Sequence, residues 1–428
     1  MTNILVFPCG SEIAMEIFQS LKYARFIQLF GGSSVDDHGR YVYQNYIGNL
    51  PFFDAPDFIE KLNKVIDMYQ IDYIFPAHDN VVLLCAQHAA ELHAKVITSS
   101  YETADICRHK TKTYEIFSDT FFNPKVYNDL DEIHDYPVLI KPDAGQGSYG
   151  VKKIENSVQL AETLKFARER MVIVEYLPGD EYTIDCFTDS KHNLRFASMR
   201  IRKRTKSGIS VCSYVVPMDE VVQEIAEVIN QKLDMRGMWF FQLKKNKDGE
   251  YRLLEIAPRV SGAMCVHRAI GVNLPLLAVY DQMGVEVACE PVMKKITVDR
   301  ALVNRFDFGW DYDRVIVDYD DTIIIKNQIN TQMMMFLYQC KNKRKPVILL
   351  TKHAGDLLAD MKKFGLGQEL FNEIIHIRPD ESKADFIEAT ERDIYIDDSF
   401  AERKEMQLKH GVQAFGVDML EVLLDWRM

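Results

Sequence analysis

The sequence predicts a multidomain protein of mixed α/β and α+β architecture. Its 428 residues exceed what one ordinary hydrophobic core accommodates. Short apolar runs alternate with amphipathic stretches over the first hundred residues, and this alternation begins again near Asp311. Between these regions an apolar strand leads directly into a glycine-rich loop. We therefore expect three consecutive domains, comprising residues 1–104, 105–310 and 311–428.

The first region has the βαβ pattern of a parallel sheet. Strands are expected at residues 3–7, 72–76 and 95–98, and helices at 14–22, 56–69 and 81–93. Loops at the carboxyl ends of parallel strands commonly bind ligands. Residues 10–12 and Asp79 are therefore candidate substrate contacts, although a tight turn explains Gly10 equally well.

The composition excludes several classes of protein. With 47% hydrophobic and 27% charged residues, the chain is typical of a globular protein in solution. No apolar run approaches the roughly 20 residues that span a bilayer, and the first residues contain no basic leader, so we expect neither a membrane partner nor a signal peptide. A net charge of −12 argues against a nucleic-acid partner. Eight scattered cysteines without a C-x-x-C pair fit a reducing cytoplasm. The basic stretch 200–206 fits either a solvated strand pair or a phosphate-facing loop.

A glycine-rich loop follows the predicted strand that ends at Lys141. It contains Gly145, Gly147, Ser148 and Gly150. Glycines allow backbone N–H groups to turn toward an anion, and the lysine adds a positive charge. The loop is neither a Walker motif nor a dinucleotide fingerprint. It predicts phosphate binding, although a flexible hairpin would have a similar sequence.

Further polar residues follow in an order that favours a nucleotide site. Glu175 and Glu181 flank a turn, where backbone amides and carboxylates suit an adenine edge and a ribose. Gln242 and Glu255 lie on two predicted neighbouring strands, and such oxygen ligands suit Mg²⁺ held together with phosphates. Arg259 follows the second strand and is suited to neutralising a transferring phosphoryl group.

This order of motifs resembles the ATP-grasp superfamily, in particular its carbamoyl-phosphate-synthase-like and D-alanine-ligase-like members, over about residues 1–290. The resemblance implies an α/β domain preceding an ATP-grasp fold, with ATP and Mg²⁺ as cofactors. It assigns phosphate contacts to Lys110 and Lys141, and Mg²⁺ ligation to Gln242 and Glu255. Arg259 would act in catalysis. The remaining nucleotide contacts would be Gly145, Gly147, Ser148, Glu175, Tyr176, the Leu177 backbone and, for the ribose, Glu181.

One position departs from the family pattern. The family usually has an asparagine two positions after the metal-binding glutamate, as a further ligand. Here that position is Ala257. We therefore expect a second Mg²⁺ to be bound more weakly, or partly by water.

The resemblance implies a ligase that joins a small-molecule carboxylate to an amine or a thiol through an acyl phosphate. Its substrates could be phosphorylated or sugar-linked. Two alternatives remain open at this point: an ATP-dependent small-molecule kinase, and a nucleotide-sensing module without catalysis, which Ala257 leaves possible.

A second set of acidic motifs lies in the last region. A predicted strand at 315–317 leads into Asp318 and Asp320, and Thr351, Lys383, Asp397 and Asp398 follow in order. An acidic surface turn explains any one of these alone. Together they resemble the haloacid-dehalogenase-like phosphatases over about residues 313–428. The resemblance implies a Rossmann-like domain in which Asp318 attacks phosphorus and Asp320 acts as acid and base. Thr351 and Lys383 would contact the phosphoryl group, and the four aspartates Asp318, Asp320, Asp397 and Asp398 would hold Mg²⁺. The motif spacing leaves no room for an inserted cap domain. An inactive scaffold remains the alternative to a hydrolase.

Overall fold

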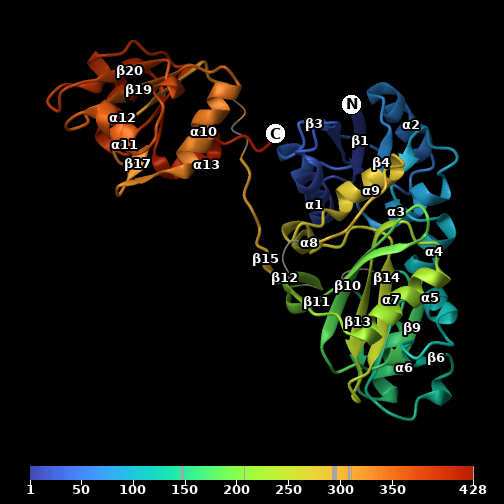
Figure 1. Cartoon of the computed structure of the whole chain (residues 1–428). Coiled ribbons are helices and arrows are strands. Elements are labelled where there is room, and N and C mark those ends of the chain that lie inside the picture. Colours follow the sequence, from blue (N-terminus) through green and yellow to red (C-terminus); the bar gives the residue numbers. More distant parts are fainter. Residues whose placement is uncertain (146–148, 207, 292–295, 307–308, 310, 428) are drawn as a thin grey trace. The chain divides into compact units, whose positions relative to one another are not determined.

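The computed structural model describes residues 1–145, 149–206, 208–291, 296–306, 309 and 311–427. The chain forms two compact units, Met1–Leu302 and Val303–Met428, which we describe separately (Figure 1). Among the described residues, no helix is both long and apolar enough to cross a membrane. The predicted domain boundary at 104/105 falls inside the first unit, and it stays a prediction, as does the boundary at 310/311.

The first unit begins with a parallel sheet that is covered on both faces. Its strand order is β3-β2-β1-β4-β5. The strands are β1 (Thr2–Phe7), β2 (Ile27–Gly32), β3 (Asn45–Ile47), β4 (Tyr73–Pro76) and β5 (Lys95–Val96). Along β1, Ile4 and Val6 join the core beneath α1 (Glu12–Leu21), whereas Leu5 and Phe7 join the core beneath α2 (Phe58–Tyr69) and α3 (Asp79–Gln87). The predicted βαβ pattern is confirmed, and β2 and β3 add two strands that we did not predict.

The loop before helix α1 contains a capping serine and a glycine with a steric role. Ser11 caps the helix, because its Oγ accepts the Ala14 N–H at 3.1 Å. A Cβ on Gly10 would lie 2.3 Å from the carboxyl carbon of Asp37. Gly10 therefore permits a close approach between two loops at the carboxyl edge of the sheet.

Two antiparallel sheets complete the first unit. A four-stranded sheet has the order β6-β9-β7-β8 and a six-stranded sheet the order β14-β13-β10-β11-β12-β15. Their strands are β6 (Val126–Tyr127), β7 (Val138–Pro142), β8 (Lys152–Ile154), β9 (Met171–Glu175), β10 (Glu181–Thr188), β11 (Leu194–Lys206), β12 (Ile209–Val216), β13 (Gly237–Lys245), β14 (Tyr251–Ala257) and β15 (Thr297–Asp299). The accompanying helices are α4 (Tyr101–Arg108), α5 (Lys110–Ile116), α6 (Ser157–Lys165), α7 (Glu220–Lys232), α8 (Cys265–Ala269) and α9 (Leu274–Gln282).

The six-stranded sheet has one apolar and one polar face. On β10, Tyr182, Ile184 and Cys186 join the core formed with α7, which lies against this sheet (Figure 1). Side chains alternate along a strand, so Glu181, Thr183 and Asp185 lie on the opposite face. The register pairs Thr183 with Gln242, and Gln242 with Glu255. The predicted metal ligands therefore share the polar face.

A buried charged network lies on this polar face. The Asp185 carboxylate, fully buried, accepts hydrogen bonds from Arg200 Nε at 2.7 Å and Ser261 Oγ at 2.6 Å, and lies 2.9 Å from His267 Nε2. Burial opposes ionisation, yet Arg200 and His267 hold the pKa of Asp185 well below its ordinary value. Because β10, β11, the segment after β14 and α8 each contribute a group, this network ties four segments together.

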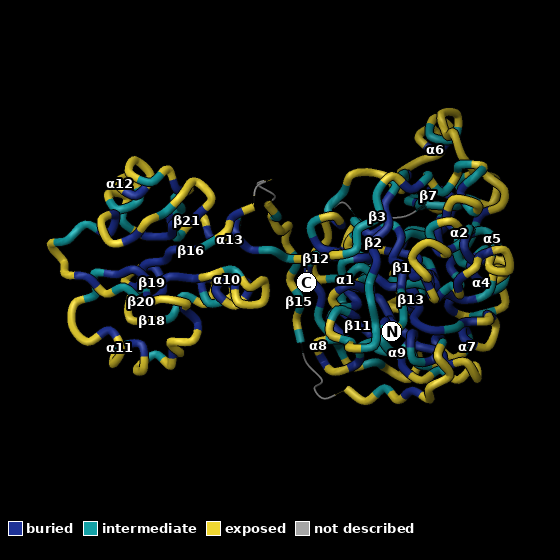
Figure 2. The backbone as a smooth tube through the Cα atoms, turned by 90° about the horizontal axis from the view of Figure 1, so that it is seen from above, coloured by how far each residue is buried: buried dark blue, intermediate teal, exposed yellow. Residues whose placement is uncertain are grey.

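The second unit contains a parallel sheet of order β20-β19-β16-β21-β22. Its elements are β16 (Arg314–Val317), β17 (Ile324–Ile325), β18 (Gln328–Ile329), α10 (Thr331–Asn342), β19 (Val347–Thr351), α11 (Leu357–Lys363), β20 (Glu373–His376), β21 (Asp393–Ile396), α12 (Phe400–His410), β22 (Gln413–Phe415) and α13 (Leu420–Leu423). The buried strands β16 and β19 run through the middle of this unit (Figure 2). Val315 and Val317 pack with residues of α10, and Ile316 packs with Met406 of α12, so helices cover both faces.

The Asp185 network gives a stability prediction. Asp185→Asn leaves the buried Arg200 without a counter-charge, so the free energy of unfolding should fall by about 3–5 kcal/mol. Asp57→Asn is the control, because Asp57 forms an exposed ion pair with Lys61 and its loss should leave stability unchanged. Urea unfolding measures both variants, and an equal, small effect would contradict a structural role for the network.

Candidate functional site

The first unit contains three adjoining hollows beside the polar face of the six-stranded sheet. The central hollow, of about 220 Å³, includes Lys141, Glu181, Gln242 and Glu255 in its lining. A second, more apolar hollow is lined by Glu175, Tyr176 and Leu177, and it shares Lys141 and Leu254 with the first. The third is lined by Asp79, Arg108, Lys110, Glu255 and Arg259, and it shares Lys110, Gly145 and Glu255 with the first. The hollows therefore form a continuous row that brings together most predicted nucleotide contacts.

Two buried lysines lie where the hollows meet. Lys141 is the penultimate residue of β7, and its Nζ donates to Tyr114 Oη at 2.5 Å, while Tyr114 donates to the Leu254 carbonyl at 2.8 Å. Lys110 begins α5, and its Nζ donates to the Gly145 carbonyl at 3.4 Å. Burial, together with the nearby charge of Lys110, lowers the pKa of Lys141 to about 7. Burial also lowers the pKa of Lys110.

Gln242 and Glu255 offer oxygen ligands to a metal ion. They are directly paired across β13 and β14, and both line the central hollow. One amide and one carboxylate fit Mg²⁺, which usually takes few protein ligands and completes its shell with waters and phosphates. Ala257 lines the third hollow, where its methyl group provides no ligand. The donor set therefore fits one Mg²⁺ better than two.

At the apolar end, the Glu175 side chain is already bound by the protein. Its Oε1 accepts the Lys125 N–H at 2.8 Å and lies 3.5 Å from Arg252 Nε. An adenine contact from this side chain would therefore have to share the carboxylate with Lys125 and Arg252. The contact from the Leu177 backbone stays a prediction. The Lys153 ammonium lies 4.7 Å from the ring centroid of Tyr176, which stands at the same hollow.

The basic stretch at 200–206 is a strand pair. It lies on β11 and pairs with β12, and residues 203–206 are exposed, as a solvated strand pair requires, but Arg200 and Arg202 are not. Arg200 is committed to the buried Asp185 network, and Arg202 forms an ion pair with Glu181 in the central hollow. A ribose bound by Glu181 would therefore have to share this carboxylate with Arg202.

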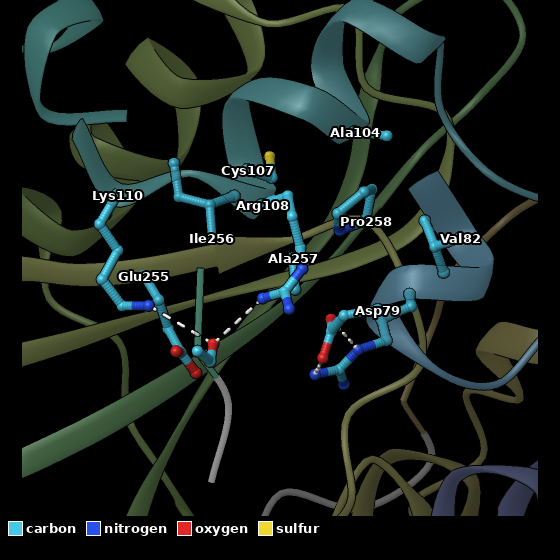
Figure 3. A pocket seen from close by; sticks show the side chains of 12 residues that line it. Asp79, Val82, Ala104, Cys107, Arg108, Lys110, Glu255, Ile256, Ala257 and Pro258 are labelled. Atoms are coloured by element: carbon cyan, nitrogen blue, oxygen red, sulfur yellow. Dashed lines mark hydrogen bonds and ion pairs between the residues drawn. The ribbon is translucent and has the colours of Figure 1, made fainter. Parts of the chain in front are cut away.

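Arg259 and Asp79 come together from positions 180 residues apart. Arg259 Nε and Nη2 donate to the two carboxylate oxygens of Asp79 at 2.6 and 2.9 Å, as the dashed lines beside Asp79 mark in Figure 3. Burial opposes the charge of Asp79, but Arg259 holds its pKa below the ordinary value. The pairing links the segment after β14 to the first residue of α3, and Arg259 and Glu255 line the same hollow.

Sequence reasoning missed Arg108 and Asn80. Arg108 Nε donates to Asn80 Oδ1 at 2.9 Å, and its Nη1 donates to the Gly145 carbonyl at 3.3 Å. Arg108 lies two residues before Lys110, and this proximity was the available signal. Gly147 and Ser148 lie outside the described residues.

The second unit gathers carboxylates at the carboxyl edge of its sheet. Oxygens of Asp318, Asp397 and Asp398 lie within 4.8 Å of one another. Lys383 Nζ donates to Asp318 Oδ1 at 2.5 Å and to Asp397 Oδ2 at 2.6 Å. Burial, opposed by Lys383 and reinforced by Asp397, raises the pKa of Asp318 to about 6. These side chains follow β16 and β21, which are adjacent strands.

The chemistry of this cluster fits a divalent cation and a phosphoryl group. Three close carboxylates are the oxygen ligands that Mg²⁺ requires. Thr351 is fully buried, and its Oγ1 has no hydrogen-bond partner within the described part of the chain. Such an orphaned hydroxyl suits an oxygen atom of a bound ligand. Asp320 is placed differently, because its carboxylate lies 3.0 Å from His353 Nδ1 rather than in the close group of three.

Comparisons with known proteins agree with the fold of the first unit. Residues 167–302 match a family model described as ATP-grasp in the biosynthetic pathway with Ter operon. No curated protein matches the sequence. Among solved structures, a biotin carboxylase from Campylobacter jejuni has a TM-score of 0.55 at 17% identity, covering 67% of this chain and 72% of that one.

Two further structures have the same fold. An L-amino acid ligase from Bacillus licheniformis has a TM-score of 0.56 at 17% identity, covering 68% of this chain and 78% of its own. An N5-carboxyaminoimidazole synthetase from Staphylococcus aureus, complexed with ADP, has a TM-score of 0.58 at 16% identity, covering 70% and 82%. The chain therefore has the ATP-grasp fold over about two thirds of its length.

The lowered pKa of Lys141 predicts that nucleotide binding takes up a proton. At pH 8 this lysine is mostly neutral before binding, and phosphate oxygens raise its pKa by favouring the charged form. Binding should take up close to one proton at pH 8, and affinity should fall as pH rises further. Isothermal titration calorimetry in two buffers of different ionisation enthalpy measures the uptake. Lys141→Arg, which is always protonated, should lose it, and equal uptake in both proteins would refute the assignment.

Proposed function

We propose that the first unit is an ATP- and Mg²⁺-dependent ligase that joins a carboxylate to an amine or a thiol through an acyl phosphate. The observation that carries this proposal is the arrangement around Glu255. Gln242 and Glu255 line the central hollow together with Lys110 and Lys141. Glu255 also lines the third hollow, where Arg259 lies. A metal site between two cationic groups suits transfer of a γ-phosphoryl group.

The proposed reaction follows from the poor electrophilicity of a carboxylate. A carboxylate oxygen attacks the γ-phosphorus, the bond to the β-phosphate oxygen breaks, and ADP leaves. The amine then attacks the acyl carbon, phosphate leaves, and the amine loses a proton. Bound Mg²⁺ would supply neutralisation of phosphate charge. Lys110 and Lys141 hold phosphate oxygens, and Arg259, fixed by Asp79, faces the acid.

The neighbouring structures support small-molecule substrates. One is named an L-amino acid ligase and another an N5-carboxyaminoimidazole synthetase. We infer that the substrates of this chain are likewise a small carboxylate and a small amine, with a phosphate or sugar group as a further possibility. All eight cysteines are free, and we infer a reducing compartment such as the cytoplasm.

Glu255→Gln tests the proposed metal site. The change removes a carboxylate charge while keeping shape, so ADP release in the presence of acid and amine should fall about 100-fold or more. Glu227→Gln, an exposed change on α7, should leave the rate unchanged. ADP release is measured for the full chain against panels of acids and amines.

The products distinguish the proposal from its alternatives. The ligase predicts that ADP release requires an acid and yields an amide or a thioester. Release without any dependence on a carboxylate would refute it, and a phosphorylated product without a new amide would identify a kinase. Nucleotide binding without turnover would favour a sensing module.

For the second unit we propose a Mg²⁺-dependent phosphatase, which is the activity that its resemblance to haloacid-dehalogenase-like enzymes implies. The supporting observations are that Lys383 donates to both Asp318 and Asp397, and that Thr351, with its orphaned hydroxyl, ends the adjacent strand β19. Asp318, Asp397 and Asp398 would hold Mg²⁺, which would neutralise phosphate charge. The fourth predicted ligand, Asp320, lies outside this close group of three, and its part in metal binding stays a prediction. Asp318 would attack phosphorus while Lys383 and Thr351 hold phosphoryl oxygens.

Asp318→Asn tests this second activity. Removing the attacking carboxylate should lower hydrolysis of p-nitrophenyl phosphate by the full chain at least about 1000-fold. The assay contains Mg²⁺ and no ATP, so the first unit does not contribute phosphate. Asp313→Asn is a matched control, since Asp313 is an exposed partner of Arg392 in the same unit. Hydrolysis that survives both Asp318→Asn and chelation of Mg²⁺ would refute the proposal.

A further inference from the structure

Asp320 is an exposed side chain with a single fixed contact. Its side chain is 53% exposed, and both carboxyl oxygens lie 3.0 Å from His353 Nδ1. Within the described residues, no other side chain bonds to this carboxyl group. Exposed carboxylates ordinarily sample several rotamers, so His353 is the contact that selects one orientation of Asp320.

His353 is itself held by two contacts besides Asp320. It follows β19 by two residues, and its side chain is only 13% exposed. The ring meets the buried ring of Tyr319 edge-on, with centroids 5.2 Å apart and planes at 83°. The His353 backbone carbonyl accepts a hydrogen bond from His376 Nε2 at 2.7 Å. A fixed imidazole therefore faces a carboxyl group that would otherwise be mobile.

Two neighbouring polar side chains are bound to other partners. Tyr319 donates its hydroxyl hydrogen to Asp360 at 3.1 Å, and Lys352 forms an ion pair with Glu402 at 2.6 Å. Neither competes with His353 for Asp320. An imidazole nitrogen can form a hydrogen bond with a carboxyl group, so the 3.0 Å contact of His353 Nδ1 can fix the orientation of Asp320.

We propose that His353 is a positioning residue that aims Asp320 at the leaving group of a phosphate ester. This inference rests on the proposed phosphatase function of the second unit. In the step concerned, an Asp318 oxygen bonds to phosphorus while the bond from phosphorus to the ester oxygen breaks. The proton of the Asp320 carboxyl group passes to that ester oxygen, which leaves as an alcohol. His353 touches neither reacting atom and acts only by orienting the acid.

The dependence of the rate on the leaving group tests this role. p-Nitrophenolate leaves readily without a proton, whereas phenolate is a much poorer leaving group and needs one. His353→Ala should therefore lower kcat/KM for phenyl phosphate at least about tenfold, and for p-nitrophenyl phosphate less than about threefold. His353→Asn should restore much of the loss, because its side-chain amide lies where Nδ1 lay. Asp320→Asn should show the same selective loss, and adding His353→Ala to it should cause no further loss.

Two failures can be told apart. If the wild-type chain hydrolyses neither ester, the phosphatase proposal fails and the inference fails with it. If the wild type hydrolyses both esters and His353→Ala slows both equally, the positioning role is refuted and the phosphatase stands. A second measurement needs no metal or turnover: the His353 Nδ1 resonance should shift on Asp320→Ala, and an unchanged resonance would overturn the proposed contact.

Discussion

The alternation of side chains across β10, β13 and β14 is the constraint on which the first unit depends. One face of this sheet carries Ile184, Phe241 and Ile256 into the core with α7, and the other carries Thr183, Gln242 and Glu255 toward the hollows. A slip of one residue in register would exchange the two faces. The same register therefore determines both the metal ligands and the apolar core, because the side chains that are not buried against α7 must face the hollows.

The buried Asp185 network and the Arg259–Asp79 pair extend this constraint beyond the sheet. Ser261 binds Asp185 at 2.6 Å and lies two residues beyond Arg259, so the segment carrying the arginine is tied down at both ends. A buried ion pair is seldom a large net source of stability, but it specifies one arrangement of the groups that it joins. Here it joins strands, a helix and a loop around the proposed reaction centre.

The pKa values of the buried lysines in the two units are shifted in opposite directions. Burial and the neighbouring cation Lys110 lower the pKa of Lys141, although Glu255 and Glu181 oppose this shift. Lys383 has two carboxylate partners, and although burial disfavours its charge, Asp318 and Asp397 raise its pKa. In the first unit, phosphates would add negative charge that favours the protonated form of Lys141, whereas in the second unit Asp318 and Asp397 already favour the protonated form of Lys383. A divalent cation would meet one carboxylate, Glu255, in the first unit and three carboxylates in the second, so phosphates would make up more of its ligands in the first.

Much of this organisation could be predicted from sequence, because it depends on neighbours along the chain. The sequence pattern predicted the hairpin of β13 and β14 and a shared face for Gln242 and Glu255. Their direct pairing depends on an irregularity in the register of β14, which period-two alternation does not predict. Strand β2 was missed because Gly31 and Gly32 suggest a turn. In the structure Gly31 lies within the strand, where a Cβ would be only 2.5 Å from the Tyr43 side chain. Only the tertiary structure paired Arg259 with Asp79, turned Glu175 toward Lys125, and set His353 against Asp320. These contacts, and the pKa shifts that depend on them, vary with distances between residues far apart in sequence, and no local pattern encodes such distances.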